Sequence, residues 1–221
     1  MRTVDLVVPV KGLPFAKSRL LASFGSGDRA EHQRTVLALI TDTVSAVLAA
    51  EAVREVLVVT PDPDVTAAGR ELGASTLPDT SAGGLNAALE LGERHLRERY
   101  PGTRVGALLA DLPALRPVEV TAAVHAARGA RAFCPDREGT GTTLLLSAEG
   151  GALEPRFGPS SAAAHLASGA VPLWGPWPGL RCDVDTSNDL GAATELGLGA
   201  ATVGVAPDPA VPPERPRAVR A

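Results

Sequence analysis

The sequence predicts a three-layer α/β fold, in which a mainly parallel sheet lies between two layers of helices. Through the first 130 or so residues, short apolar runs rich in β-branched residues alternate with helical patterns. The strand runs are apolar at nearly every position, which is typical of strands buried on both faces. A chain of 221 residues, 45% hydrophobic and 21% charged, is large enough and apolar enough for one such domain.

Five strands are expected, because five short runs combine apolar and β-branched residues. They cover residues 3–10, 54–60, 104–111, 131–135 and 142–147. Where helices connect parallel strands, the crossovers are right-handed. Ligands then bind along the edge formed by the carboxyl ends of the strands.

Helical patterns fill the intervals between the first strands. The first covers about 28–50 and opens with Asp28 and Glu31, an arrangement close to a capping box. Others cover about 63–72, 84–100 and 117–129, the last with Pro at its start and Gly at its end. Beyond residue 130 we expect shorter strands, glycine-rich loops, a short helix near 160–168 and a final helix from about residue 186.

Composition, net charge and the lengths of the apolar runs limit which domain organisation and which partners are possible. We expect a single domain over residues 1–203 and a disordered tail over 204–221, which is rich in proline. A net charge of −4 and a pI near 5.6 argue against nucleic acid as a partner, and no apolar run is long enough for a membrane span. The start of the chain lacks a signal-peptide pattern, so a cytoplasmic location is expected. Cys134 and Cys182 are then most simply buried apolar residues.

A basic loop follows the first strand. The segment VPVKGLPFAKSRL contains Lys11, Lys17 and Arg19, together with Gly12, which permits close approach to the backbone. Three cations at the carboxyl end of a strand could bind a polyphosphate. The loop matches neither a P-loop nor a dinucleotide fingerprint, and a solvated basic turn is the alternative interpretation.

Three further segments could belong to a site, although each has an ordinary structural explanation. In LLADLPAL, Asp111 ends an apolar strand and could bind a divalent cation or simply cap a turn. The loops PDREGTGTT and FGPSSAAAH are rich in small residues and hydrogen-bond donors that could bind an anion. The segment GGLNAAL joins a glycine pair to a helix start and could contact a nucleoside. We interpret His165 as a packing residue rather than a catalyst.

The segment CDVDTSNDL, residues 182–190, divides into two parts. Thr186 and Asp189 have the spacing of a helix cap. Alternation along a preceding strand would place Asp183 and Asp185 on one side, where two carboxylates repel unless a cation lies between them. The DxDxT pattern also matches haloacid-dehalogenase-type phosphatases, but too little of the chain follows it for that catalytic domain. A metal site is the favoured interpretation.

Taken together and in their order along the chain, these six segments resemble the 2-phospholactate and phosphoenolpyruvate guanylyltransferase family, over about residues 4–196. The resemblance implies a Rossmann-like three-layer α/β/α fold of the nucleotide-diphospho-sugar transferase type, as in MobA-like nucleotidyltransferases. It also implies an enzyme that transfers GMP from GTP to phosphoenolpyruvate, with release of pyrophosphate, in the biosynthesis of the deazaflavin coenzyme F420.

The resemblance further implies roles for individual residues. Asp111, Asp183 and Asp185 would bind Mg²⁺ and, with Lys17, form the catalytic set. The phosphoenolpyruvate would be bound by Thr143, Gly158 and Ser161. The GTP phosphates would contact Lys11, Lys17 and Arg19, and the nucleoside would contact the loop from Gly84 to Asn86.

Several alternatives stay open at this stage. The acceptor could be 2-phospho-L-lactate or 3-phosphoglycerate, or the chain could be a molybdopterin or sugar nucleotidyltransferase. A different class would be a nucleotide-binding module without activity, although three carboxylates exceed what simple binding requires. A homodimer and transfer of the product to the downstream transferase of the coenzyme F420 pathway are further expectations.

Overall fold

The computed structural model describes residues 3–13, 20, 29–81 and 83–205. Its centre is a seven-stranded sheet with the order β3-β2-β1-β4-β6-β5-β7. The strands are β1 (Val4–Pro9), β2 (Val53–Thr60), β3 (Ser75–Pro78), β4 (Val105–Leu108), β5 (Ala132–Pro135), β6 (Thr142–Leu146) and β7 (Val171–Pro172). Strands β1, β2, β3 and β4 pair in parallel, whereas β6 is antiparallel to both of its neighbours. The predicted mainly parallel sheet is confirmed.

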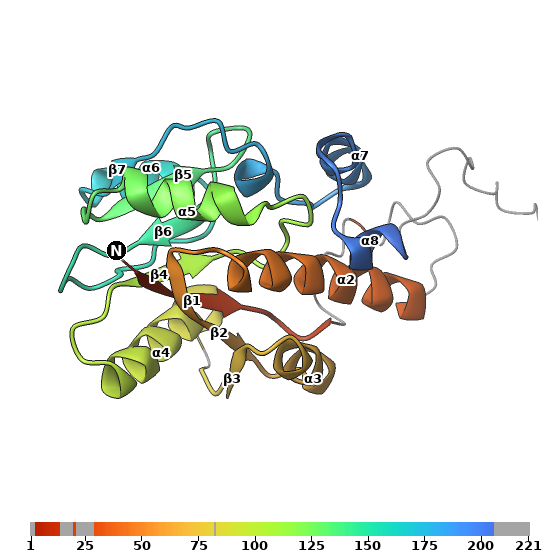
Figure 1. Cartoon of the computed structure of the whole chain (residues 1–221), viewed down its shortest axis with the longest axis horizontal. Helices are drawn as coiled ribbons and strands as arrows, with labels where there is room; N and C mark the ends of the chain where they lie inside the picture. The colour runs from red at the N-terminus through yellow and green to blue at the C-terminus, as the bar shows by residue number, and fades with distance from the viewer. Residues whose placement is uncertain (1–2, 14–19, 21–28, 82, 206–221) are drawn as a thin grey trace, which may run out of the picture.

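Helices cover both faces of this sheet (Figure 1). They are α2 (Arg29–Leu48), α3 (Pro63–Glu71), α4 (Gly84–Arg99), α5 (Pro117–Ala126), α6 (Ser161–Ala167), α7 (Ser187–Leu196) and α8 (Ala200–Val203), with a 3₁₀ turn η2 (Gly179–Arg181). Apolar residues of α2, α3 and α5 form one core with the sheet, and those of α4 and α6 form the other. The arrangement is the predicted three-layer sandwich.

A close contact between α4 and β1 fixes the position of the start of α4. A Cβ atom at Gly92 would lie 2.5 Å from Val7 Cγ1, so glycine permits the helix to lie directly on the strand. Because α4 follows a parallel strand, its first turn then lies at the carboxyl edge of the sheet.

The structure differs from the sequence-based expectation in several places. Strands β3 and β7 and helix α8 were not expected, because each is short and only partly apolar. The strand expected over 104–111 ends at Leu108. The expectation of a strand at Asp183 and Asp185 is wrong: the segment follows η2 and forms a loop. The expected cap at Asp28 and most of the tail lie outside the described residues.

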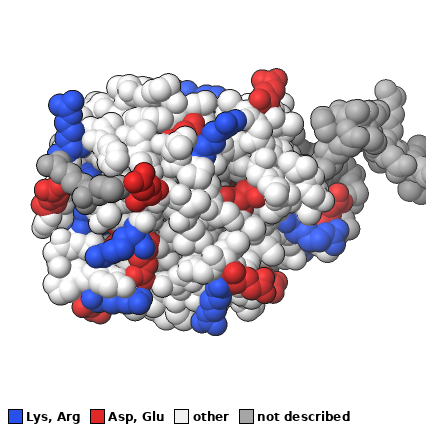
Figure 2. Space-filling model, viewed as in Figure 1, with Lys and Arg blue, Asp and Glu red and all other residues white. Residues whose placement is uncertain are grey.

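Charged side chains are interspersed over the face seen in Figure 2, with acidic and basic residues as neighbours. Among the described residues, no helix combines the length and the apolar character needed to cross a bilayer. Cys134 and Cys182 are both free thiols and buried, as expected. Burial raises the pKa of the Cys134 thiol to about 11.

Candidate active site

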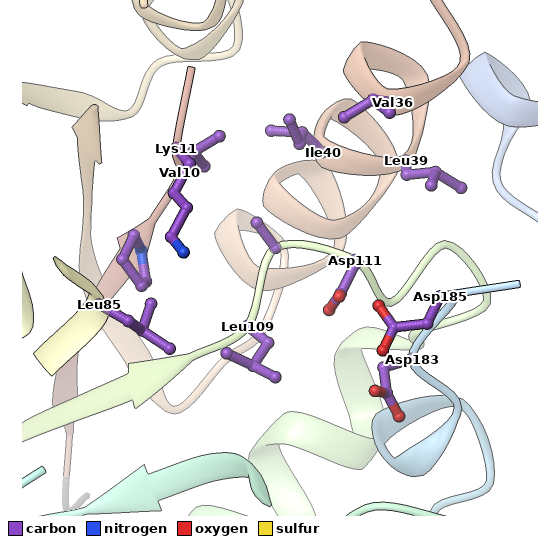
Figure 3. A pocket seen from close by; sticks show the side chains of 12 residues that line it. Val10, Lys11, Val36, Leu39, Ile40, Leu85, Leu109, Asp111, Asp183 and Asp185 are labelled. Carbon is purple, nitrogen blue, oxygen red and sulfur yellow. The ribbon is translucent and has the colours of Figure 1, made fainter. Parts of the chain in front are cut away.

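A cavity of about 380 Å³ opens at the carboxyl edge of the parallel strands. It combines an apolar wall with four charged residues, a composition typical of small-molecule sites. The lining residues are Pro9, Val10, Lys11, Val36, Leu39, Ile40, Leu85, Leu109, Ala110, Asp111, Asp183 and Asp185. In Figure 3, the three aspartates gather on one side and Lys11 faces the same space from the other.

Asp111 is positioned by backbone contacts on both sides of it. The Leu109 N–H donates to the Thr143 carbonyl at 3.0 Å, which extends the pairing of β4 with β6 beyond the last strand residue. The Leu112 N–H donates to Thr43 Oγ1 of α2 at 2.9 Å. Residues 109 and 112 are therefore each fixed by a hydrogen bond, and Asp111 lies between them.

The segment carrying Asp183 and Asp185 is attached to Asp111 through the backbone. The Val184 N–H donates to the Asp111 carbonyl at 3.0 Å, and the Val184 side chain is fully buried. With Val184 directed inward, Asp183 and Asp185 are the more exposed residues on either side of it. The expected alternation thus holds without a strand, and it brings all three predicted metal ligands to one cavity.

The cap that follows this segment is confirmed. The Thr186 hydroxyl accepts from the Asp189 N–H at 3.3 Å, and Asp189 Oδ2 accepts from the Thr186 N–H at 2.9 Å. The same oxygen accepts from the Asp185 N–H at 3.3 Å, while the other carboxylate oxygen pairs with the Arg137 guanidinium at 2.8 Å. Partial burial would raise the pKa of Asp189, but these hydrogen bonds lower it overall. Asp189 therefore stays ionised and holds the backbone at Asp185, a role that the spacing alone did not reveal.

A second carboxylate group adjoins the first and was not expected from the sequence. Oxygens of Asp136, Glu138 and Asp183 all lie within 4.8 Å of one another. However, Asp136 already accepts from the N–H groups of Thr140 at 2.9 Å and Gly141 at 2.7 Å, so it has a structural function in closing the turn between β5 and β6. The sequence PDREGTG could have indicated this turn.

The residues of the basic loop are only partly described. Lys11 lines the cavity, whereas Lys17 and Arg19 lie outside the described residues. The described end of the loop is held by a residue that sequence reasoning missed. Asp62 caps α3 and also accepts from the Leu13 N–H at 2.9 Å. The DP pair at the start of α3 predicts the cap but not the second contact.

The predicted nucleoside loop begins α4. Gly84 is its first residue, with φ at 74°, a conformation that favours glycine. The carboxamide of Asn86 is bonded to the backbone of Phe157: Nδ2 donates to the carbonyl at 3.0 Å, and Oδ1 accepts from the N–H at 2.8 Å. Asn86 therefore connects this loop to the segment that precedes Gly158.

The three residues predicted to bind the acid lie around the turn between β5 and β6. Thr143 is fully buried, and its hydroxyl donates to the Cys134 carbonyl at 3.4 Å. Ser161 begins α6 and is 2% exposed, and the following Ala162 N–H donates to the Thr140 carbonyl at 3.1 Å. Gly158, with φ at 141°, lies three residues before Ser161, whose N–H donates to the Gly158 carbonyl at 3.1 Å. The residues described as lining the cavity do not include these three.

His165 is buried, which agrees with its interpretation as a packing residue. Its Nε2 accepts from the Arg156 N–H at 2.9 Å, so the ring proton lies on Nδ1, which is 2.9 Å from Thr142 Oγ1. The ring packs against Phe133 and Phe157. Burial, aided by Arg131 and Arg156, lowers the pKa of His165 to about 4. The imidazole is therefore neutral near pH 7.

The fold and this site define a nucleotidyltransferase. A MobA-like NTP transferase domain matches residues 19–170. A solved 4-diphosphocytidyl-2C-methyl-D-erythritol synthase is similar in fold, with a TM-score of 0.60 and 13% identity over 89% of this chain and 99% of that one.

The sequence relatives narrow the class to one family. A phosphoenolpyruvate guanylyltransferase of Geodermatophilus obscurus is 52% identical over 202 residues, 90% of this chain and 92% of that protein. One from Salinispora arenicola is 51% identical over 200 residues, 89% of this chain and 90% of that protein. The chain belongs to the phosphoenolpyruvate guanylyltransferase family.

Proposed function

We propose that this enzyme transfers GMP from GTP to phosphoenolpyruvate, forming enolpyruvyl-2-diphospho-5'-guanosine and releasing pyrophosphate. The observation that carries the proposal is the 52% identity, over 90% of the chain, to a protein named for this reaction. The product belongs to the biosynthesis of the deazaflavin coenzyme F420, and the location is the cytoplasm.

The three aspartates at the cavity are carboxylates of the kind that bind a Mg²⁺-type cation, although the described carboxylate oxygens that lie within 4.8 Å of one another are those of Asp136, Glu138 and Asp183. Carboxylate oxygens are the donors that such hard cations prefer, and Asp111, Asp183 and Asp185 line one cavity opposite Lys11. When bound, Mg²⁺ neutralises phosphate charge and supplies a Lewis acid at the reacting phosphorus. The adjoining group of Asp136 and Glu138 is the less suitable pair, because Asp136 is committed to the backbone of its turn.

The protein residues bind and orient two anions that would otherwise repel each other. Lys11 contacts the GTP phosphates, as do Lys17 and Arg19, and the loop at Gly84 contacts the nucleoside. Thr143, Gly158 and Ser161 bind the acid. Holding both reactants in line supplies much of the acceleration in reactions of this kind.

The transfer itself needs no protein nucleophile. A phosphate oxygen of phosphoenolpyruvate forms a bond to the α-phosphorus of GTP, while the bond from that phosphorus to the bridging oxygen of the β-phosphate breaks. The electron pair leaves with pyrophosphate. The attacking phosphate is ionised at neutral pH, so a general base is not required either.

The direct test is pyrophosphate release by the purified protein with GTP and Mg²⁺. Phosphoenolpyruvate, 2-phospho-L-lactate and 3-phosphoglycerate are supplied separately, each with and without EDTA. The proposal predicts the highest kcat/KM with phosphoenolpyruvate and no release in EDTA. A higher kcat/KM with another acid would identify that acid as the acceptor in place of phosphoenolpyruvate. No pyrophosphate release with any acid would overturn the proposed reaction.

A further inference from the structure

The segment leading to Gly158 is irregular and is held mainly by side chains from elsewhere. We name residues 153–161 the acceptor loop. It contains three residues with positive φ, namely Glu154 at 51°, Gly158 at 141° and Ser160 at 57°. Non-glycine residues in this region are disfavoured, so the conformation persists only where the surroundings enforce it.

One face of α4 supplies two of the contacts that enforce it. Glu93 Oε1 accepts from the Leu153 N–H at 2.9 Å, at the beginning of the acceptor loop. Asn86 lies about two helical turns earlier on the same face and bonds both backbone groups of Phe157. Of these two α4 side chains, Asn86 therefore holds the residue directly before Gly158, whereas Glu93 holds a residue five positions before it.

The contacts of Asn86 argue against a primary role in reading the base. Its oxygen and its nitrogen are both directed at Phe157, and this pair fixes the orientation of the amide. The Phe157 side chain is only 8% exposed and packs edge-on against His165, so the clamped peptide lies within a packed region. A side chain engaged in this way acts on the acid through the backbone that it holds.

We infer that Asn86 is a positioning residue for the acceptor acid: through its two bonds to Phe157 it sets the backbone at Gly158. The inference rests on the proposed function for the identity of the acid. It replaces the expectation, drawn from family resemblance, that Asn86 contacts the nucleoside. It also links the two substrates physically, because the same first turn of α4 carries Gly84 and contributes Leu85 to the cavity.

The first experiment measures the backbone directly and requires no substrate. Hydrogen exchange is followed by mass spectrometry for peptides covering the acceptor loop in the parent, Asn86→Ala and Glu90→Gln. Glu90 is exposed on the same helix and serves as the matched control. Loss of both bonds should speed exchange in the loop about tenfold in Asn86→Ala, with no change in Glu90→Gln. Unchanged exchange in Asn86→Ala would overturn the inference.

The second experiment separates the two substrates. In Asn86→Ala, the KM for phosphoenolpyruvate should rise about tenfold, while the KM for GTP and the preference for GTP over ATP stay within about twofold of the parent. A higher KM for GTP or a weakened base preference, with an unchanged KM for the acid, would identify Asn86 as a nucleoside contact instead.

A substitute variant and the substrate-free exchange measurement allow failure of this inference to be distinguished from failure of the proposed function. If Asn86→Ala fails to fold, Asn86→Asp is used, because it keeps the acceptor for the Phe157 N–H and replaces only the donor to the carbonyl. The carboxylate oxygen that replaces the donor repels the Phe157 carbonyl oxygen, so this variant should show the same substrate pattern as Asn86→Ala. An unaltered KM for the acid would contradict the inference. If the parent transfers GMP to none of the acids, the proposed function fails, but the exchange experiment still decides whether Asn86 holds the loop.

Discussion

The cavity wall and the loop proposed to bind the acid are built by different means. The carboxylate wall, residues 109–113 and 182–189, is joined by main-chain hydrogen bonds such as that from Val184 to Asp111. The acceptor loop is held instead by the side chains of Asn86, Glu93 and His165. Substitution of a wall carboxylate that lines the cavity, namely Asp111, Asp183 or Asp185, should therefore change chemistry and leave the fold intact. Substitution of a support of the loop should change stability or affinity for the acid.

The largest effect is expected at the wall. Asp183→Asn or Asp185→Asn should lower kcat by about 10²- to 10⁴-fold, because each removes a charge that would bind the cation. The midpoint of thermal unfolding should move little, since Asp183 is only partly buried and Asp185 is exposed. Turnover and unfolding are measured for both variants and for Glu195→Gln, an exposed change on α7. Turnover near the parent rate in either aspartate variant would contradict the metal assignment.

The next largest effect is the pH dependence of the free energy of unfolding that arises from His165, which supports the acceptor loop. The pKa of His165 is about 4 in the folded protein against 6.5 for the ordinary side chain, so the unfolded chain binds more protons between these values. This contribution to the free energy of unfolding is present above pH 6.5 and is lost as the pH falls toward 4, by up to about 3 kcal/mol. Urea unfolding across this range should show the loss in the parent and not in His165→Gln, whose side chain does not titrate. An equal loss in both proteins would be the contrary result.

A smaller effect is expected where the wall meets the turn between β5 and β6. Asp189→Asn should destabilise the protein by about 1–2 kcal/mol, because the amide weakens the cap and the pair with Arg137. It should also reduce kcat moderately, because the backbone at Asp185 is less firmly held. Arg137→Gln, which keeps the cap, should cost less on both measures. Equal or larger losses in Arg137→Gln would show that the ion pair, and not the cap, positions Asp185.

The smallest effect is expected at Gly158. A Cβ atom there would meet nothing within 4 Å, so Gly158→Ala should cost only the backbone strain of a φ of 141°, roughly 1 kcal/mol. The strain should appear as weaker binding of the acid, measured as its KM. A comparable rise in the KM for GTP would indicate that Gly158 does not belong to the acid site.

Much of the fold could be predicted because the parallel strands are continuous apolar runs and the longer helices are amphipathic. The short elements β3, β7 and α8 carry too few apolar residues for a pattern. The strand expected at Asp183 was wrong because alternating burial can arise in a loop, here through the single buried side chain of Val184 and its bond to Asp111.

The site was predictable where one residue type at a strand end carries the signal, as at Asp111 and Lys11. It was not predictable where the backbone is held by contacts between distant segments. The bonds from Asn86 to Phe157 and from Asp62 to Leu13 join residues far apart in the sequence, and nothing local distinguishes these side chains from ordinary helix-start residues.

Asp111, Asp183 and Asp185 are proposed to bind the cation at which the two substrates meet. Anomalous scattering from crystals of the protein grown with Mn²⁺ and phosphoenolpyruvate would locate the ion directly. We expect a peak in the cavity within coordination distance of Asp111 and Asp185. A peak bound by Asp136 and Glu138 without Asp111, or none near the three aspartates, would contradict it.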